Sequence, residues 1–436
     1  MPGATALTRL DPEFLRRSVE VLFESASPHA TSVGRGGVGI EVELIPVLPP
    51  DRPPAPGSEA LLDQVVAGIS AAGRFTFEPG GQLEYSGPVC ASLAASVEDV
   101  EAAVARVRAA AGAAGLDLRS RGLGPWFGPS EVGLRRPTPR YREMDRYFAR
   151  RGPWGRWMMR LSASQQVNLD FGPPGEMEAR WRTANDLTPL LVAVFANSPA
   201  RLPGGAEVAA GRWWVWRRTD PARTGRPGGW SAVDGPRAVP PWSAYLTFAL
   251  SAPVMFDAAM RPVLLDGEEA PRFTDWWSSA GEGGPEEADW RAHLGTLFPD
   301  VRPRHWMEIR AVDVPQRPWW SVPPAVLAAL LYDRRARVAL DERLAAIPGP
   351  AEGLCERAIR DGLADSVLRE AAVELFRLAE AAMARYPAAW FGERTRGIVA
   401  EFRERFVEAG RTQADEARER GEVARLEPPS GEAAAE

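Results

Sequence analysis

The chain has 436 residues, of which 45% are hydrophobic, and it carries a formal net charge of -6. This composition is that of a globular protein that can bury a core in one large domain or in two. The acidic balance argues against a nucleic-acid-binding surface, and the 2 cysteines are too few for a disulfide framework or a cysteine-built zinc site.

The sequence contains no lysine, so all 52 basic residues are arginines. Mechanisms that need a lysine are therefore excluded. They include the phosphate-binding lysine of P-loop proteins, the ATP-binding lysine of protein kinases and Schiff-base catalysis. If the protein handles phosphate, arginine side chains and a metal ion must do so.

Apolar periodicity predicts helices over residues 11–24 and 92–115, with a loop from Pro46 to Gly57 between them. Residues 201–241 are dense in Gly, Pro, Arg and Trp. This density predicts a long irregular segment, whose tryptophans argue against disorder. From Val322 to Arg425 apolar residues recur every three or four positions, which predicts helices almost throughout.

We expect a single domain over residues 1–425, with the sheet and the candidate site at about 37–323 and a helical region at about 324–425. Residues 426–436, which include PPSGEAAAE, are expected to form a disordered tail. The N-terminal sequence lacks the unbroken apolar stretch of a signal peptide, and the longest apolar run, near 187–196, is too short to span a bilayer. A cytoplasmic location without a membrane partner is therefore expected.

Four short segments share one pattern, with apolar residues on one face of a strand and polar residues on the other. In GVGIEVELIPV, residues 37–47, Glu41 and Glu43 lie opposite Ile40 and Val42, and the two carboxylates are about 7 Å apart along the strand. The pattern recurs in three later segments, whose polar faces carry Gln82 and Glu84, then Gln166, Asn168 and Asp170, then Glu308 and Arg310.

Carboxylates and carboxamides dominate these polar faces. Like charges packed on one sheet repel each other unless a cation lies among them. Hard oxygen ligands of this kind suit magnesium rather than zinc. The three histidines, His29, His293 and His305, are dispersed, so a histidine metal site is not expected. An ordinary antiparallel sheet with one solvent-facing side is the alternative.

Several motifs together resemble one family. They are GIEVEL, FTFEPGGQLEYSGP, RYREMDRYF followed by GPWGRWMM, QVNLDFG, FANSP, the RTG at Arg223 to Gly225, and MEIRAVD. From about Gly37 to about Pro323 the chain resembles the glutamate-cysteine ligases of the plant and actinobacterial type, which include those that open the ergothioneine pathway. FEPGGQLEYSG is unusually specific, whereas GIEVE alone is weak.

The resemblance implies an α+β fold similar to glutamine synthetase and the guanidino kinases, with a curved antiparallel sheet and helices packed on its apolar face. It also implies that the concave face binds ATP and two or three magnesium ions. In such ligases the γ-carboxylate of glutamate attacks the γ-phosphate of ATP, and the amine of cysteine then displaces phosphate from the acyl phosphate. Repulsion between the two anions is the main barrier, which metal ions and arginines lower.

Carried over position by position, the resemblance assigns roles to individual residues. The implied magnesium ligands are Glu41, Glu43, Glu84, Glu308 and Gln166. The implied catalytic residues are Glu84, Glu308 and Arg310, and the implied substrate-binding residues are Arg212, Arg310 and Asn168. The implied ATP-binding residues are Arg223 and Glu78, although Glu78 could instead fix its turn through hydrogen bonds to the backbone.

Two alternatives to a glutamate-cysteine ligase stay open on the sequence alone. Residues Arg160 to Gln165 replace the Cys-Ser-Thr or similar segment of relatives, so an Arg160 that faced the site would favour an amine other than cysteine. The first alternative is a γ-glutamyl ligase that uses such a different amine in a specialised pathway, and the second is a non-catalytic relative that binds glutamate or nucleotide and regulates a partner. The intact carboxylates of the implied metal site favour catalysis.

Only small-molecule partners are expected, and the oligomeric state and the pathway do not follow from the sequence.

Overall fold

The structure, a computed structural model, describes residues 10–29, 36–49, 52, 59–228, 239–264, 270–279 and 284–426. Its main element is a sheet of 7 strands with the order β2-β3-β1-β5-β9-β8, to which β4 adds by pairing with β1. All of these pairs are antiparallel. The strands are β1 (Val38–Val47), β2 (Arg74–Phe77), β3 (Leu83–Ser86), β4 (Asp117–Arg119), β5 (Ser164–Leu169), β8 (Val301–Pro303) and β9 (Met307–Asp313).

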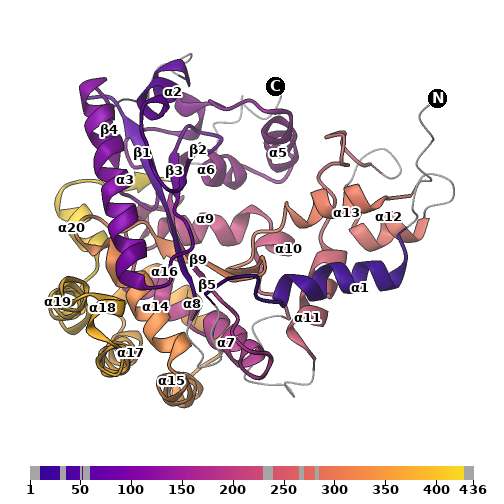
Figure 1. The fold of residues 1–436 in the computed structure, drawn as a ribbon. Coiled ribbons are helices and arrows are strands. Elements are labelled where there is room, and N and C mark those ends of the chain that lie inside the picture. The colour runs from indigo at the N-terminus through magenta and orange to yellow at the C-terminus, as the bar shows by residue number, and fades with distance from the viewer. Residues whose placement is uncertain are drawn as a thin grey trace.

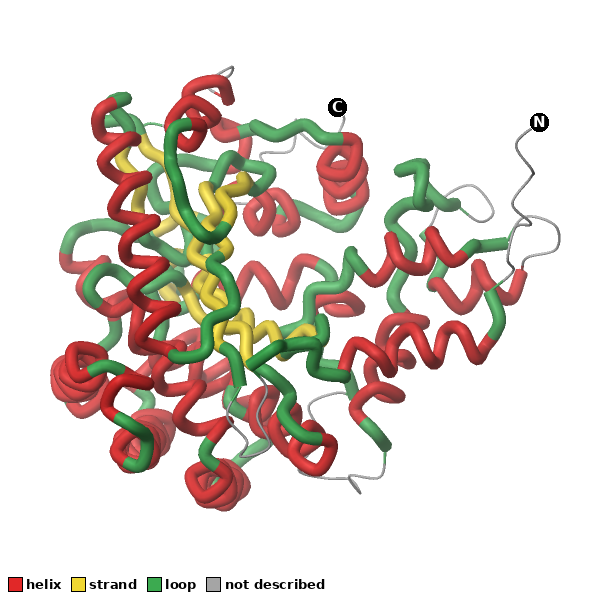
Figure 2. Tube along the Cα trace, in the orientation of Figure 1, coloured by secondary structure: helices red, strands yellow, loops and turns green. Residues whose placement is uncertain are grey.

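Helices surround this sheet, as the red and yellow tube of Figure 2 shows. Those before β8 are α1 (Pro12–Glu20), α2 (Glu59–Ala67), α3 (Leu93–Ala113), α4 (Pro129–Val132), α5 (Pro139–Ala149), α6 (Trp154–Leu161), α7 (Pro174–Asp186), α8 (Thr188–Val194), α9 (Gly211–Thr219), α10 (Pro221–Thr224), α11 (Pro241–Ser251), α12 (Phe273–Ser279) and α13 (Glu287–Leu294). Those after β9 are α14 (Val322–Tyr332), α15 (Arg334–Ala346), α16 (Ala351–Asp361), α17 (Ser366–Ala384), α18 (Ala388–Phe391), α19 (Glu393–Phe402) and α20 (Gln413–Glu419). A second, 3-stranded sheet has the order β10 (Ala424–Arg425), β6 (Ala200–Arg201) and β7 (Glu207–Val208).

The four segments predicted as strands are confirmed, and the register brings their polar faces together. Glu43 lies opposite Glu84 on β3, and Glu41 lies opposite Gln166 on β5. On the far side of β5, Asn168 lies opposite Glu308 of β9. Because directly opposed residues of an antiparallel pair project on the same face, the polar side chains of four strands form one continuous surface.

The other face of the sheet is apolar and buried. The side chains of Ile40, Val42, Val167 and Ile309 are at most 1% exposed. Helices α3, α8 and α14 pack on this side, and every residue of α14 is buried because α15, α17 and α19 cover it from outside. Figure 1 shows these helices gathered on one side of the sheet, while α1, α11, α12 and α13 form a separate group. The predicted α+β class, with helices on the apolar face, is confirmed.

The predicted helix at 11–24 is α1 followed by a short 3-10 turn, Val21–Phe23, and the helix at 92–115 is α3. The helical region after 322 is also confirmed. The loop prediction from Pro46 was wrong at its start, because Pro46 and Val47 still pair with β4. Residues 427–436 of the predicted tail lie outside the described residues, whereas Leu426 is buried.

The expectation of an irregular segment over 201–241 was wrong for its first half, which holds β7, α9 and α10. Helix α9 begins at Gly211, where a Cβ atom would lie 2.5 Å from the Cβ of Ala200 and 2.7 Å from the carbonyl oxygen of Ser198. Glycine is therefore needed here because the first residue of α9 packs closely against Ala200 and Ser198, and it does not indicate an irregular loop. Residues 229–238 lie outside the described part of the chain.

One cluster of buried apolar side chains extends from Leu10 to Leu426. The single domain expected over residues 1–425 stays a prediction. Both cysteines are free, and Cys355 is buried whereas Cys90 is half-buried. Within the described ranges no helix combines the length and the apolar character that crossing a membrane would require.

Candidate active site

A cavity of about 820 Å³ lies over the polar face of the main sheet. Helices α5, α6 and α9 and the β8–β9 connection form its other walls. Every carboxylate, carboxamide and arginine that the sequence assigned to a role lines it, with the exception of Arg223: Glu41, Glu43, Glu78, Glu84, Gln166, Asn168, Arg212, Glu308 and Arg310. The alternation of polar and apolar residues therefore predicted the floor of a cavity.

The glycine turn before Glu84 brings β3 against α6. A Cβ atom at Gly80 would lie 2.2 Å from the carbonyl oxygen of Arg160, and Gly81 has a φ of 88°. Only glycine fits at both positions. Backbone groups close the turn, since Glu78 N donates to Gln82 O at 2.8 Å and Gly81 N donates to Glu78 O at 2.8 Å. The Glu78 carboxylate is thus not what fixes the turn, and it lines the cavity instead.

One side of the cavity is acidic, and neutral donors orient its carboxylates. Glu43 accepts hydrogen bonds from the Ser164 backbone N at 2.6 Å, from Ser164 Oγ at 3.0 Å and from Gln166 Nε2 at 3.0 Å. Asn168 Nδ2 donates to Glu41 Oε1 at 2.8 Å. Each carboxylate is therefore oriented by neutral hydrogen-bond donors, which place no positive charge in contact with it.

Glu84 is oriented in the same way. Thr76 Oγ1 and Ser86 Oγ donate to its Oε1, at 2.8 and 2.9 Å respectively. Thr76 comes from the edge strand β2, and Ser86 is the last residue of β3 itself. Two hydroxyl groups thus fix one carboxylate oxygen of Glu84 and leave the other for a ligand.

Crowding of these carboxylates shifts their titration. Burial, together with the charges of Glu308 and Glu84, raises the pKa of Glu41 to about 7. Burial, together with Glu84 and Glu43, raises the pKa of Glu78 to about 8. An acid whose folded-state pKa is raised costs the fold free energy as the pH rises through that value. This acidic side therefore favours a cation among its carboxylates.

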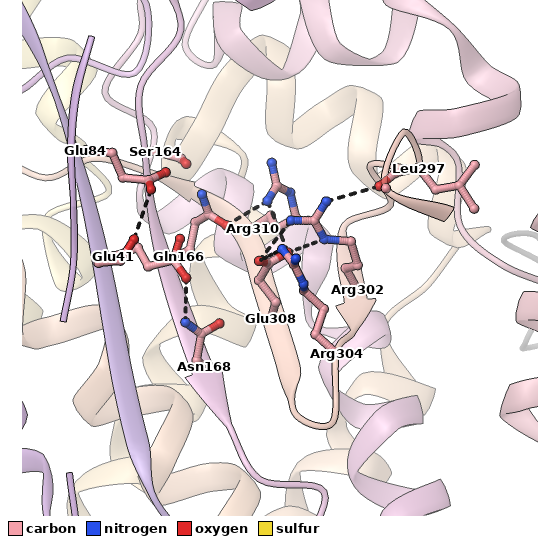
Figure 3. Close-up of polar contacts among 12 residues, drawn as sticks. Glu41, Glu84, Ser164, Gln166, Asn168, Leu297, Arg302, Arg304, Glu308 and Arg310 are labelled. Carbon is pink, nitrogen blue, oxygen red and sulfur yellow. Dashed lines mark hydrogen bonds and ion pairs between the residues drawn. The ribbon is translucent and has the colours of Figure 1, made fainter. Parts of the chain in front are cut away.

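The opposite side of the cavity is basic and centres on Glu308, which Figure 3 shows among three arginines. Arg302 Nη2 donates to Glu308 Oε1 at 2.9 Å, Arg310 Nη1 lies 3.1 Å from Oε2, and Arg304 Nη1 lies 3.4 Å from Oε1. Arg310 Nη1 also donates to Gln166 Oε1 at 2.7 Å. Burial alone would raise the pKa of Glu308, but the charges of Arg302 and Arg310 outweigh it and hold that pKa well below its ordinary value.

Several buried polar atoms in this cavity have no hydrogen-bond partner among the described residues. They are Nε of Arg212, Nε of Arg310 and Oδ1 of Asn168. Arg212 is only 3% exposed, and its Nη2 donates to the carbonyl oxygen of Arg310 at 3.0 Å. Because buried polar groups are nearly always paired, a polar ligand in this cavity could supply partners for these atoms.

The comparisons with known proteins agree with this geometry. The model of glutamate-cysteine ligase family 2 matches residues 37–432. The chain belongs to this ligase family. The family resemblance seen in the motifs is thereby confirmed, and the match extends beyond Pro323 into the helical region.

Named ligases of this family are similar over most of the chain. The chain is 35% identical over 360 residues to the glutamate-cysteine ligase EgtA of Mycolicibacterium smegmatis, which covers 80% of this chain and 80% of that protein. It is 29% identical over 329 residues to the chloroplastic glutamate-cysteine ligase of Arabidopsis thaliana, covering 73% of this chain and 61% of that one.

Among solved structures, the ligase resembles a glutamate-cysteine ligase of Francisella tularensis crystallised in complex with AMP, with a TM-score of 0.51 and 12% identity. The match covers 88% of this chain and 84% of that chain. At this identity the likeness shows the fold alone, and it agrees with the α+β class.

The donors in the cavity fit the magnesium implied for the ligase, since they are carboxylate and carboxamide oxygens. No three Asp, Glu, His or Cys side chains of the described residues already converge as ligands of one metal ion. Glu43 and Glu308 in particular use their oxygens on donors of the protein. The chemistry of the donors therefore fits, and the ligand set stays a prediction.

Arg223 is a correction to the sequence interpretation. Its side chain is 0% exposed and does not line the cavity. Its Nε donates to Asp220 Oδ2 at 3.0 Å, its Nη1 to Thr296 Oγ1 at 2.7 Å, and its Nη2 to Tyr147 Oη at 3.2 Å. Because all three nitrogens are used inside the fold, Arg223 has no donor for a phosphate, and its RTG motif is structural.

Arg223→Met is expected to lower the free energy of unfolding by about 3 to 5 kcal/mol, because it breaks a buried ion pair with Asp220 and leaves only the partly exposed Arg151, 3.4 Å away, as counter-charge. The KM for ATP should change little. Urea denaturation and steady-state kinetics measure the two effects. Arg334→Met, at a position 80% exposed, is the matched control and should change stability by no more than about 0.5 kcal/mol. A raised KM for ATP at unchanged stability would contradict the structural role.

Arg160 does not face the cavity either. Its Nη2 donates to Asp145 Oδ1 at 2.6 Å and its Nη1 to the carbonyl oxygen of Pro129 at 3.0 Å. It therefore ties α6 to α5 and α4, and it is not among the residues that line the cavity. The sequence argument for an acceptor other than cysteine needed Arg160 in the site, so it loses its support.

The structure adds residues that the sequence analysis did not single out. Arg302 lines the cavity from β8, Arg304 from the β8–β9 connection, and Arg140 and Tyr141 from α5. A signal existed for all four. Arg140 and Tyr141 open the RYREMDRYF motif, and RPR lies shortly before MEIRAVD.

Proposed function

We propose that the protein is an ATP- and magnesium-dependent ligase of the cytoplasm that joins the γ-carboxylate of L-glutamate to the amine of L-cysteine through γ-glutamyl phosphate. The observation that carries the proposal is the division of one cavity into an acidic side and a basic side, with buried donors left without partners. Membership of the ligase family and its named relatives supports the same activity.

The acidic side would hold magnesium through Glu41, Glu43, Glu84 and Gln166, with Glu308 as a further ligand. Bound magnesium would neutralise phosphate oxygens and so reduce the repulsion between the carboxylate nucleophile and the γ-phosphate. Thr76 and Ser86 fix the orientation of Glu84, and Asn168 fixes that of Glu41. Glu78, whose carboxylate faces the same space, would extend this acidic side toward ATP.

The basic side would bind the anions that react. Arg310 lies between Glu308 and Gln166, so a transferring phosphate at its Nε would be next to both sides of the cavity. Arg212 and Asn168 would bind amino-acid substrate through Nε and Oδ1, the atoms that have no partner within the described residues. Glu308 would also position Arg302 and Arg310.

Hydroxylamine tests the proposed intermediate without assuming the natural acceptor. With glutamate, ATP and magnesium but without cysteine, this small nucleophile should intercept the acyl phosphate and give γ-glutamyl hydroxamate and ADP. The hydroxamate is measured as its coloured iron complex, and the nucleotides are separated by chromatography. Glu84→Gln is the control variant and should form neither product.

Each other outcome points to a different function. AMP and pyrophosphate would mean adenylation of the carboxylate and would contradict the acyl phosphate. Hydroxamate without ligation of cysteine, but with ligation of another amine from a panel, would favour the γ-glutamyl ligase of a specialised pathway. Binding of glutamate and ATP with no product under any condition would favour the non-catalytic relative.

A further inference from the structure

A second cavity, of about 440 Å³, lies beside α9, α10 and α16. Trp213 and Arg217 of α9 line it, whereas Arg212 and Trp216 of the same helix line the principal cavity. One helix thus separates two cavities. The size of the second is within the range of small-molecule sites, roughly 300 to 1,000 Å³.

The charges around the second cavity are balanced. Three arginines and three carboxylates line it: Arg217, Arg218, Arg226, Asp300, Glu352 and Glu356. Arg217 Nη2 donates to Glu352 Oε1 at 3.0 Å, and Arg226 pairs with Asp186 outside the cavity. A lone anion or a lone cation would meet like charges here, so a molecule that carries both charges fits better.

Asp300 is the unusual member of this set. Its side chain is 2% exposed and lines the cavity, and its Oδ1 has no hydrogen-bond partner among the described residues. Burial raises the pKa of Asp300 to about 7, against the opposing charges of Arg226 and Arg217. A buried carboxylate oxygen of this kind calls for a donor, and a ligand ammonium group would supply one.

We propose that this second cavity binds a free α-amino acid, with the ligand carboxylate on Arg218 and Arg226 and the ligand ammonium on Asp300. Arg218 is exposed at the cavity mouth and stacks over the ring of Trp214 at 4.1 Å, which holds its guanidinium in place. The site recognises the two groups that all α-amino acids share, so it should accept several side chains.

The same residues connect the second cavity to the active site. The backbone N of Arg310 donates to the carbonyl oxygen of Asp300 at 2.9 Å. From α9, Arg212 Nη2 donates to Arg310 O at 3.0 Å and Trp213 Nε1 donates to Ala311 O at 2.9 Å. A ligand on Asp300 and α9 therefore contacts groups that set the position of Arg310 and Arg212, and it should change the affinity of the active site for its amino-acid substrate.

Isothermal titration calorimetry tests the binding step on the full-length protein. The probes are glycine, L-alanine, L-serine and L-glutamate, each titrated into wild type, Asp300→Asn and Arg218→Gln. At least one probe should bind wild type and lose affinity tenfold or more in both variants. Arg218→Gln changes an exposed side chain, so it keeps the test valid if Asp300→Asn folds poorly.

The matched control is Asp361→Asn, a half-buried carboxylate of α16 that pairs with Arg360 and lines neither cavity. It should bind the probes as wild type does. No binding by any of the four probes would overturn the proposal, and so would binding that is equally strong in wild type, Asp300→Asn and Arg218→Gln. This measurement needs no turnover, so its result is independent of the activity proposed above.

Steady-state kinetics test the connection to the active site. Glycine should change the KM for glutamate by about fivefold or more in wild type, within the usual range of coupling between sites, and should have no such effect in Arg218→Gln. An equal change in both proteins would mean that glycine acts in the principal cavity and would overturn the proposal. If glycine leaves the KM for glutamate unchanged in both proteins, the proposed connection between the cavities would be overturned.

Discussion

Glu84→Gln is expected to lower kcat by at least about 100-fold while the protein keeps its fold. Mutation of residues that only orient metal ligands typically lowers metal affinity or activity roughly 10- to 100-fold, so the loss of a ligand itself should lower kcat more. The carboxamide oxygen can still accept the hydrogen bonds that Thr76 and Ser86 give to Glu84. Steady-state kinetics with saturating glutamate, ATP and magnesium measure the loss.

The thermal midpoint of the metal-free Glu84→Gln protein should hold or rise. The charge of Glu84 is among the causes that raise the pKa of Glu41, Glu43 and Glu78, so a neutral side chain relieves repulsion on three neighbours. Differential scanning calorimetry in the presence of EDTA measures this midpoint. Glu98→Gln, an exposed position of α3, is the matched control and should leave both kcat and the midpoint unchanged. A fall of several degrees without metal would make Glu84 a structural residue.

The polar floor of the cavity could be predicted because strand alternation is a local property. Glu41 and Glu43 are separated by one residue, and so are Glu308 and Arg310, so each pair lies on one face in any extended chain. Which strands lie side by side is not local. The opposition of Glu43 to Glu84 depends on pairing between segments about forty positions apart, which only the folded chain defines.

The sequence could not show which of its buried arginines reach the cavity. Arg223 and Arg212 are both buried, in segments rich in Gly, Pro and Trp, yet Arg212 reaches the cavity and Arg223 does not. The difference lies in their partners. Tyr147, Asp220 and Thr296 enclose Arg223 from three different segments, and no pattern within the RTG motif shows that.

The surroundings of Glu308 were also beyond the sequence. The motif places Arg310 two residues from Glu308 on the same strand face, but Arg302 approaches across the β8–β9 pair, where it lies directly opposite Glu308. Strand β8 has only three residues and ends at a proline, so it has too little alternation to be recognised as a strand. The sequence therefore implied that the Glu308 carboxylate is free to bind a metal ion, whereas the structure places this carboxylate among arginines.

Glu308→Gln is expected to reduce kcat as Glu84→Gln does, and to have the opposite effect on stability. Glu308 is 2% exposed and accepts hydrogen bonds from both Arg302 and Arg310, so the carboxamide would remove the counter-charge that these two arginines contact directly. Breaking a buried ion pair in this way costs about 3 to 5 kcal/mol. Two carboxylates in one cavity, changed in the same way, should therefore shift the free energy of unfolding in opposite directions.

The pH dependence of stability should change with the same substitution. The pKa of Glu308 is held below its ordinary value, so this carboxylate stabilises the fold above the pKa of the unfolded chain, about 4.3, and the stabilisation is lost as the pH falls below it. Glu308→Gln should remove that part of the acid sensitivity. Urea denaturation of wild type and variant at neutral and at acid pH measures it, and the two proteins should differ less at the lower pH.

A double variant separates the ion-pair effect from a general loss of packing. In Arg302→Gln/Glu308→Gln both charges are absent, so its loss of stability should be smaller than the sum of the two single losses. Turnover should fall in all three variants, and kcat should fall far more than the KM for glutamate rises, because contacts to the transferring phosphate act chiefly in the transition state. A Glu308→Gln protein as stable as wild type would show that the arginines do not depend on Glu308. It would favour Glu308 as the open magnesium ligand that the sequence implied.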